Sequence, residues 1–160
     1  QPQKDKGVKI TDFLSVQTVI PTLAKQDKQA VLDEMAEWLA ASYPNLDKNK
    51  VLEVLHERER ISTTAIGEGV AIPHGKLPGV ERVLGVVARS PQGGDFASLD
   101  GGLTHLFFVL IAPEHAAADH LKALARISRL LKDETFRRRL LAGQTSQELF
   151  TIIADEDDKF

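Results

Sequence analysis

Residues 106–112 read Leu-Phe-Phe-Val-Leu-Ile-Ala, an apolar run without a polar residue. The run is rich in β-branched and aromatic side chains and is followed by Pro113, which is typical of a β-strand. A strand with one face in water would alternate apolar and polar residues, so this run predicts a central strand that is covered on both faces. We therefore expect helices on both sides of a sheet built around residues 105–112.

Helical periodicity follows this strand. After Pro113, inward positions step by four, three and four residues, at His120, Leu124, Ile127 and Leu131. A further helix is predicted through residues 136–141 and ends at Gly143. Thr145, with Glu148 three residues later, has the spacing of a capping box at the start of a last helix.

Two more helices are predicted ahead of the main strands. The first begins near Gln26 or Asp27 and stops before Pro44, with apolar residues four apart at Val31, Met35 and Leu39. The second has Asp47 as its N-cap, and its inward positions are Val51, Val54, Leu55 and Arg58. This phase turns the guanidinium of Arg58 toward the sheet.

Shorter apolar runs with β-branched residues complete the sheet. Val70–Ile72 and Val83–Ala88 are predicted strands, the second bounded by the turn signal Pro91-Gln-Gly-Gly94. Val19–Leu23 contains Pro21 and fits only an edge strand. The fold class is therefore α/β or α+β, with three α/β/α layers in which a small mixed sheet is flanked by helices.

Composition limits the number of domains and the kinds of partner. The 160 residues are 42% hydrophobic and 27% charged, which fits one domain. We expect a flexible segment over residues 1–9, a single domain over residues 10–154 and an acidic tail over residues 155–160. A formal net charge of -3 argues against a nucleic-acid surface. Cysteine is absent and no apolar run could cross a bilayer, so we expect a cytoplasmic protein without membrane insertion.

The most informative stretch is Thr63-Thr-Ala-Ile-Gly-Glu-Gly-Val-Ala-Ile-Pro-His-Gly-Lys76. Its Gly-x-Gly pair permits unusual backbone angles, and Pro73 and Gly75 bracket one imidazole at the end of a strand. No Gly-Lys-Ser/Thr follows the glycines, so a nucleotide-binding loop is excluded. The segment presents His74, whose neutral ring has one nitrogen lone pair that can act as a base, metal ligand or nucleophile. A purely structural histidine is the alternative.

Three other side chains can join His74 at one rim of the sheet. His120 lies in the opening turn of a helix, on its apolar side, where it could also bond a backbone carbonyl as a boundary residue. Arg58 needs an anion, and a guanidinium matches phosphate well, although a structural salt bridge to Glu68 or Glu57 would also satisfy it. Glu68 is a candidate resting-state partner of Arg58 that yields when a phosphoryl group arrives, or else a solvated loop carboxylate.

Metal chemistry has weaker support. His115 and His120 are five residues apart and miss the i, i+4 spacing of a helical metal pair, and no His-Glu-x-x-His string occurs. A metal-dependent hydrolase built on His74, His120 and Glu68 would have to be assembled from distant parts of the chain. The basic run at residues 137–139 is interpreted as a solvated helix face.

Several of these residues together resemble a known family. The string Ala65-Ile-Gly-Glu-Gly-Val-Ala-Ile-Pro-His-Gly-Lys76, with Arg58-Glu59 before it and His120-Leu121 after it, resembles the enzyme IIA proteins of the bacterial phosphotransferase system, fructose/mannitol class. The resemblance covers about residues 14–154, and the nitrogen-regulatory branch looks the most similar. It implies a phosphoryl carrier that accepts phosphate on His74 from an HPr-like phosphocarrier, HPr or NPr, without a metal or cofactor.

The resemblance also implies roles for the other site residues. His120 matches a second active-site histidine that hydrogen-bonds the phosphoryl group, and Arg58 matches an arginine that helps to neutralise it. Glu68 matches an acidic position of mannitol-type members, whereas nitrogen-type relatives more often have Asn there and Gly at Ala65.

The nitrogen branch implies regulation of partners such as sensor kinases or potassium-transport proteins. Two alternatives stay open at this point. One is a sugar-transport IIA component that passes phosphate to a separate IIB chain. The other is a binding module that works without phosphorylation.

Overall fold

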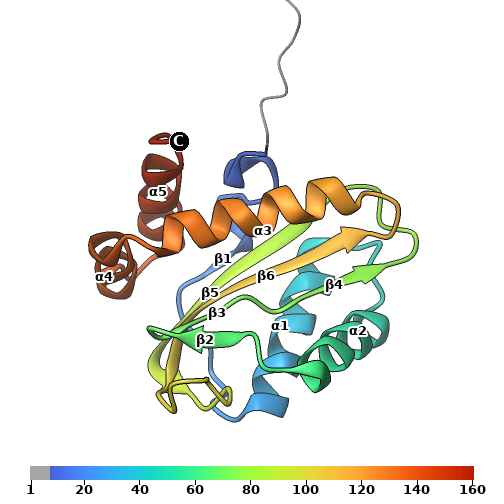
Figure 1. The fold of residues 1–160 in the computed structure, drawn as a ribbon, viewed down its shortest axis with the longest axis horizontal. Coiled ribbons are helices and arrows are strands. Elements are labelled where there is room, and N and C mark those ends of the chain that lie inside the picture. The colour runs from blue at the N-terminus through green and yellow to red at the C-terminus, as the bar shows by residue number, and fades with distance from the viewer. Residues whose placement is uncertain (1–7) are drawn as a thin grey trace, which may run out of the picture.

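The computed structural model describes residues 8–160 as a mixed sheet between two layers of helices (Figure 1). Most of the segment expected to be flexible, residues 1–9, lies outside the described residues. Two short 3₁₀ helices come first, η1 (Ile10–Asp12) and η2 (Val16–Thr18). The strands are β1 (Val19–Ile20), β2 (Ala65–Gly67), β3 (Val70–Ala71), β4 (His74–Leu77), β5 (Leu84–Gly94) and β6 (Thr104–Pro113). The helices are α1 (Lys28–Ser42), α2 (Lys48–Ile61), α3 (Ala117–Leu131), α4 (Glu134–Ala142) and α5 (Ser146–Asp157).

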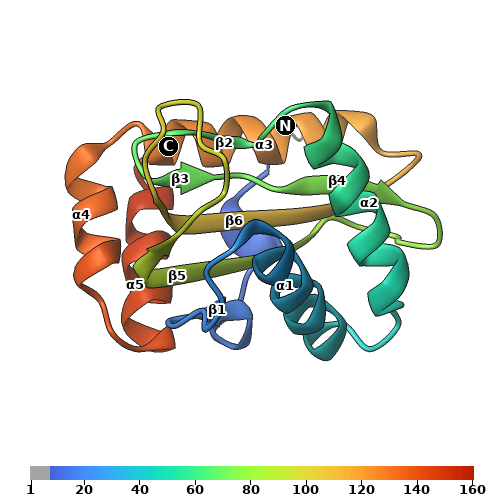
Figure 2. The same ribbon diagram turned by 90° about the horizontal axis from the view of Figure 1, so that it is seen from below.

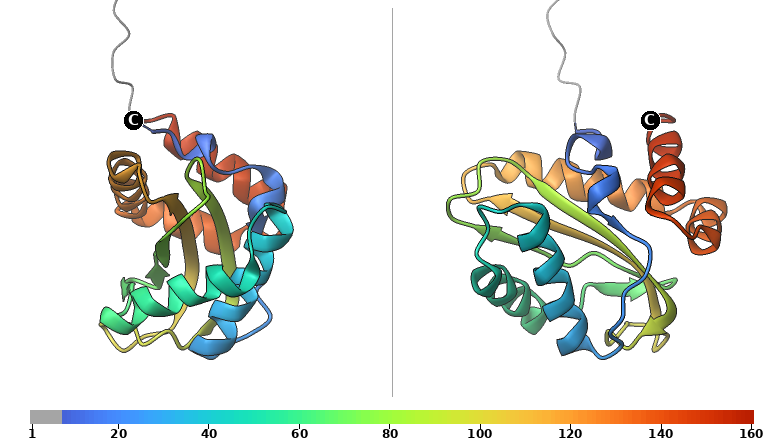
Figure 3. Two further views of the ribbon diagram at one scale, coloured as in Figure 1. Left: turned by 90° about the vertical axis from the view of Figure 1, so that its right-hand side faces the viewer. Right: turned by 180° about the vertical axis from the view of Figure 1, so that it is seen from behind.

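Strand β6 is the central strand that the apolar run predicted. It pairs antiparallel with β5 on one side and parallel with β3 and then β4 on the other, which gives the order β1-β5-β6-β3-β2. Its side chains alternate between two cores. Leu106, Phe108 and Leu110 belong to the core with α3, α4 and α5, whereas Phe107, Val109 and Ile111 belong to the core with α1 and α2. Figure 3 shows helices on both faces of the sheet, so the predicted three-layer fold class is confirmed.

The predicted helix starts and the edge strand are also present. The side chains of Asp27, Asp47 and Thr145 each accept a hydrogen bond from a backbone N–H in the first turn of α1, α2 and α5. These bonds satisfy N–H groups that have no partner within the helix. Strand β1, within the predicted segment Val19–Leu23, lies at the edge of the sheet and runs parallel to β5.

The strands around the central motif differ from the prediction. One strand, Val70–Ile72, was expected within residues 63–76, but the chain forms β2, β3 and β4, and His74 opens β4 instead of following the end of a strand. Pro73 has no N–H to donate and separates β3 from β4, while both strands pair with β6. Strand β5 also continues through Pro91, because the pairing register is irregular between Arg89 and Gly94 and a proline is tolerated there.

Of the acidic tail expected over residues 155–160, residues 155–157 belong to α5. Helix α5 runs to Asp157, and the side chains of Glu156 and Asp157 are buried. Asp157 binds the guanidinium of Arg126 on α3 and accepts a hydrogen bond from the backbone N–H of Ile10 at 3.0 Å. Lys159 lies 3.0 Å from the Glu156 carboxylate. The helix turns both acids inward, where cations offset their charge. We name these residues the C-terminal cluster: Arg126, Glu156, Asp157 and Lys159.

Candidate active site

A pocket of about 450 Å³ opens where β4, α2 and α3 meet, and it contains three of the four predicted site residues. Helix α2 approaches β4 closely because residue 75 is a glycine: a Cβ there would lie 3.0 Å from Cγ2 of Val54. The residues that line the pocket are Val54, Glu57, Arg58, Ile61, His74, Gly75, Lys76 and His120. The structure therefore brings together His74, His120 and Arg58.

Hydrogen bonds hold the His74 ring in one orientation. Nδ1 lies 2.8 Å from the carbonyl oxygen of Ile72, which assigns the proton to Nδ1 as the donor. The Nε–H of Arg58 donates to Nε2 of His74 at 3.3 Å, so Nε2 is the unprotonated nitrogen. Burial lowers the pKa of His74 most strongly and the charge of Arg58 lowers it further, against opposing effects of Ile72 and Glu59. The ring is therefore neutral near pH 7, with a lone pair on Nε2.

The second imidazole, that of His120, packs edge-on against His74. The ring centroids lie 5.4 Å apart with an interplanar angle of 70°. His120 is buried in the first turn of α3, and its Nε2 has no hydrogen-bond partner among residues 8–160. Burial, followed by the charges of His74 and Lys76, lowers its pKa to about 4. In the tautomer that carries the ring proton on Nε2, His120 can donate a hydrogen bond to an anion bound beside His74.

Arg58 lies at the rim of the pocket in the last turn of α2. Besides the bond to His74, its Nη1 donates to the carbonyl oxygen of Ser62 at 2.9 Å. The salt bridges suggested for it are not formed, because Glu57 pairs with Arg60 and Glu68 lies elsewhere. Among residues 8–160 the guanidinium therefore has no carboxylate partner, which leaves its positive charge available to a bound anion.

The expected Arg58–Glu68 pair is absent because Glu68 lies at the other end of the sheet. It occupies the turn between β2 and β3, with a φ of 58° between two glycines of positive φ. Its exposed carboxylate lies 3.2 Å from the guanidinium of Arg137 on α4, so Arg137 is not simply part of a solvated basic face. Figure 2 shows this turn on the α4 side and β4 on the α2 side. The metal site that needed His74, His120 and Glu68 together is not assembled, and residues 8–160 contain no cluster of three metal-binding side chains.

Glu59, for which no role was predicted from sequence, is buried beside this pocket. Its carboxylate accepts hydrogen bonds from the backbone N–H of Thr64 at 3.0 Å and from the Thr64 hydroxyl, and it lies 3.0 Å from Nζ of Lys28. One signal could have found it: Glu59 continues the four-residue spacing of Val51 and Leu55, which form the buried stripe of α2. Arg58, the predicted inward residue, is one position off this stripe and is half-buried.

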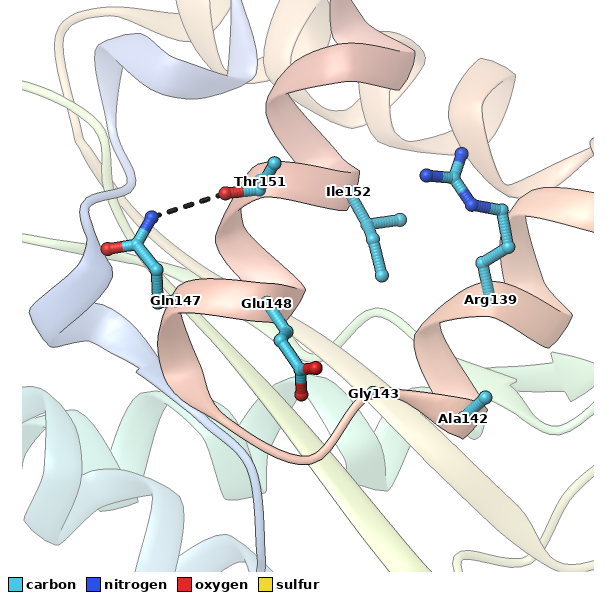
Figure 4. Close-up of a pocket in the computed structure, with 7 residues that line it drawn as sticks. All are labelled: Arg139, Ala142, Gly143, Gln147, Glu148, Thr151 and Ile152. Carbon is cyan, nitrogen blue, oxygen red and sulfur yellow. Dashed lines mark hydrogen bonds between the residues drawn. The ribbon is translucent and has the colours of Figure 1, made fainter.

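A second hollow of about 520 Å³ lies between α4 and α5 (Figure 4). Gln147 donates a hydrogen bond to the Thr151 hydroxyl there, and Arg139 faces the hollow from the neighbouring helix. Its lining has no histidine and includes both Arg139 and Glu148, charges of opposite sign. The imidazole pocket therefore has the better chemistry for a reaction.

Comparisons with known proteins point to the same chemistry. Residues 12–156 match the family described as "Phosphoenolpyruvate-dependent sugar phosphotransferase system, EIIA 2". The chain is 45% identical over 145 residues to a nitrogen regulatory protein of Bradyrhizobium diazoefficiens, covering 91% of this chain and 94% of that protein. It is 37% identical over 150 residues to the PTS system fructose-specific EIIABC component of Bacillus subtilis, covering 94% of this chain and 24% of that protein.

A solved structure extends the match to three dimensions. The crystal structure of the nitrogen regulatory protein IIA-Ntr from Neisseria meningitidis superposes with a TM-score of 0.83 at 28% identity, over 90% of this chain and 98% of that chain. Within residues 8–160, no helix is both long and apolar enough to cross a bilayer. The chain therefore belongs to the EIIA type 2 family of the phosphotransferase system, as a phosphohistidine phosphocarrier with an HPr-like donor, and it is similar to the nitrogen regulatory IIA-Ntr proteins.

Proposed function

We propose that His74 carries the phosphoryl group and that Nε2 is the atom that binds it. One observation carries this assignment: Nδ1 donates to the Ile72 carbonyl, which leaves the lone pair of Nε2 directed toward Arg58 in the pocket. The lowered pKa of His74 keeps this nitrogen unprotonated near pH 7. An unprotonated, oriented ring nitrogen is the requirement for a histidine nucleophile.

The transfer needs no proton movement at His74. The Nε2 lone pair attacks phosphorus while the N–P bond of the donor's phosphohistidine breaks, and the electrons of that bond return to the donor's ring nitrogen. Nδ1 keeps its proton, so the phosphorylated ring is positively charged and its Nδ1–H still donates to the Ile72 carbonyl. Such a reaction depends mainly on alignment and on charge stabilisation.

Arg58 must exchange partners during this step. Its Nε–H donates to the same lone pair that forms the new N–P bond, so this hydrogen bond is lost as the phosphoryl group arrives. The bond from Nη1 to the Ser62 carbonyl keeps the guanidinium in place, so its remaining N–H groups can turn to the phosphoryl oxygens. His120 donates from its unpaired Nε2, and Lys76 adds positive charge at the pocket.

The rim of the pocket suits the HPr-like donor. Ile61 on α2 and Leu121 on α3 flank the pocket and are 79% and 67% exposed. The exposed acids Glu57 and Asp119 lie on the same two helices. Exposed apolar side chains beside charged neighbours form a small contact surface that suits transient docking.

We propose that the phosphorylation state of His74 serves regulation, as the name of the Bradyrhizobium relative indicates. Phosphorylation adds negative charge to a positive pocket, so the two forms present different surfaces to targets such as sensor kinases or potassium-transport proteins. A sugar-transport role with a separate IIB acceptor is the second candidate, favoured by the fructose-specific relative.

Phosphoryl transfer in a reconstituted system tests these assignments. The protein is incubated with phosphoenolpyruvate, enzyme I and either HPr or NPr, and its intact mass is measured under alkaline conditions. We expect one acid-labile phosphoryl group, absent in His74→Ala, and faster transfer from NPr. Uptake by folded His74→Ala would move the site to another residue, and faster transfer from HPr with onward transfer to a IIB chain would support the sugar branch.

A further inference from the structure

We propose that Glu59 is a positioning residue for the transfer, because it fixes the loop that orients both His74 and Arg58. The inference rests on the proposed role of His74. Glu59 acts together with Thr64, to which it is hydrogen-bonded, and Lys28, with which it forms an ion pair. We name these three residues the anchor cluster: Lys28, Glu59 and Thr64.

A carboxylate at position 59 is costly in two ways. Its side chain is 4% exposed, and a buried carboxylate is destabilising unless it is paired and hydrogen-bonded. It also lies in the last turn of α2, where the helix dipole disfavours negative charge. An apolar residue would continue the buried stripe of Val51 and Leu55 without either cost. The presence of a carboxylate here therefore indicates a geometric role.

One chain of hydrogen bonds links the anchor cluster to Nδ1 of His74. The carboxylate of Glu59 accepts hydrogen bonds from both the backbone N–H and the hydroxyl of Thr64. The carbonyl oxygen of Thr64 accepts the backbone N–H of Ile72 at 3.2 Å. The carbonyl of Ile72 in turn accepts the Nδ1–H of His74 at 2.8 Å. A shift of Thr64 therefore moves the acceptor that sets the ring's orientation and tautomer.

A second chain of hydrogen bonds links the same segment to Nε2 of His74. Ser62 lies two residues before Thr64, and its carbonyl accepts a hydrogen bond from Nη1 of Arg58 at 2.9 Å. The same guanidinium donates from Nε to Nε2 of His74. Both ring nitrogens are thus oriented from one short segment, residues 62–64, and the carboxylate of Glu59 fixes the end of that segment.

Lys28 connects the segment to a third element, α1. Its Nζ lies 3.0 Å from the Glu59 carboxylate and 4.7 Å from the centroid of the Phe96 ring. Thr63, inside the segment, donates from its hydroxyl to the carbonyl of Phe96 at 2.9 Å. Because α1, α2 and the segment are tied together in this way, the position of residues 62–64 is set by groups that do not touch the phosphoryl group.

Replacing the carboxylate by an amide tests the inference. In Glu59→Gln, the charge is lost and the amide can no longer accept on both oxygens, so we expect part of the His74 population to adopt the Nε2–H tautomer. That tautomer has no lone pair to attack phosphorus. Two-bond ¹H–¹⁵N NMR spectra of the unphosphorylated protein at pH 7.5 report the tautomer. We expect phosphoryl uptake to slow about 10-fold to 100-fold, as for other residues that orient a reacting group.

The matched control is Asp157→Asn, the same change at a buried ion pair at the far end of the sheet. We expect it to leave the His74 tautomer and the uptake rate unchanged. Equal slowing by the two variants, or a Glu59→Gln variant with the original tautomer and rate, would overturn the inference. If Glu59→Gln does not fold, Thr64→Val is used instead, because it removes only the hydroxyl. We expect it to change the His74 tautomer and to slow uptake in the same way, and an unchanged tautomer and rate would overturn the inference. Because the NMR readout uses no phosphoryl donor, it tests the positioning even if His74 takes up no phosphate.

Discussion

The imidazole pocket and the C-terminal cluster both gather charged side chains, at opposite ends of the sheet (Figure 1). In the C-terminal cluster the charges are matched, since Arg126 binds Asp157 and Lys159 binds Glu156. The pocket instead has Arg58 and Lys76 beside two neutral imidazoles, and its carboxylate, Glu57, pairs with Arg60. In the C-terminal cluster each acid has a cationic partner that offsets the cost of burying it, whereas unmatched positive charge at the pocket can bind an anion.

The largest effect expected at the pocket is complete loss of function with little loss of stability. His74→Ala removes the proposed nucleophile but only a half-buried ring at the rim. We expect no phosphoryl uptake by intact mass, together with a far-UV spectrum and cooperative thermal unfolding like those of the original protein. Unfolding of this variant would instead place the ring among the residues that stabilise the core.

The C-terminal cluster should show the reverse pattern. Asp157→Ala leaves the guanidinium of Arg126 without its carboxylate and the N–H of Ile10 without its acceptor. We expect the free energy of unfolding in urea to fall by about 3–5 kcal/mol, as when one partner of a buried ion pair is removed. Phosphoryl uptake by the folded fraction should be unchanged, and a slowed transfer would show that the two ends of the sheet are coupled.

Arg58→Ala should affect the rate and the pH profile together. Loss of one cationic donor is expected to slow uptake about 10-fold to 1000-fold. Because Arg58 contributes to the lowered pKa of His74, the pH below which uptake falls should move upward in the variant. Rates measured from pH 5 to pH 8 check both effects, and an unchanged profile would mean that Arg58 only packs against the imidazole.

Replacing His120 should have a smaller effect, and its effect on stability should depend on pH. Its pKa is about 4 in the folded protein, against an ordinary value of 6.5, so the unfolded chain binds more protons between these two values. Stability should therefore fall as the pH drops from 6.5 toward 4, and His120→Gln should flatten this part of the curve. His120→Ala should slow transfer at pH 7.5 through loss of its hydrogen bond, and equal rates would leave His120 a structural histidine.

Glu68 should have the smallest effect. Its carboxylate is exposed and pairs with Arg137 far from the pocket. We expect Glu68→Ala to change the free energy of unfolding by about 0–1 kcal/mol, as for other surface ion pairs, and to leave phosphoryl uptake unchanged. Slower uptake in this variant would support the pairing of Glu68 with Arg58 that the sequence suggested. It would also show that the two ends of the sheet do not act independently.

Local signals explain which parts of the fold and site could be predicted from sequence. The apolar run at residues 106–112 indicated a strand covered on both faces. Asp47 indicated the start of a helix, and its side chain accepts hydrogen bonds from N–H groups in the first turn of α2. His74 could be singled out because proline and glycine bracket it. The sequence also predicted that His74 and His120 meet at one rim of the sheet, and the structure places the two rings side by side.

The missed features depend on contacts between residues far apart in the chain. Glu59 is one charge in the run Arg-Glu-Arg-Ile at residues 58–61, and its spacing from Val51 and Leu55 indicates burial but not its contact with Lys28 on another helix. The acidic end was expected to be a tail because of its run of like charges, and its partner Arg126 lies far away in the sequence, on α3. Strands β2 and β4 are too short to show periodicity, since their pairing with β3 and β6 defines them.

The hydrogen bond between Ile10 and Asp157 joins the first and last elements of the described chain. The two ends of the domain therefore lie together beside α5, on the side of the sheet away from α2 and β4 (Figure 1). A segment attached at either end would start away from the proposed phosphoryl site. This arrangement suits a module within a larger chain, as in the Bacillus subtilis relative, of which the matching region spans 24%. A neighbouring domain can be attached at either end while the histidine stays open to its donor.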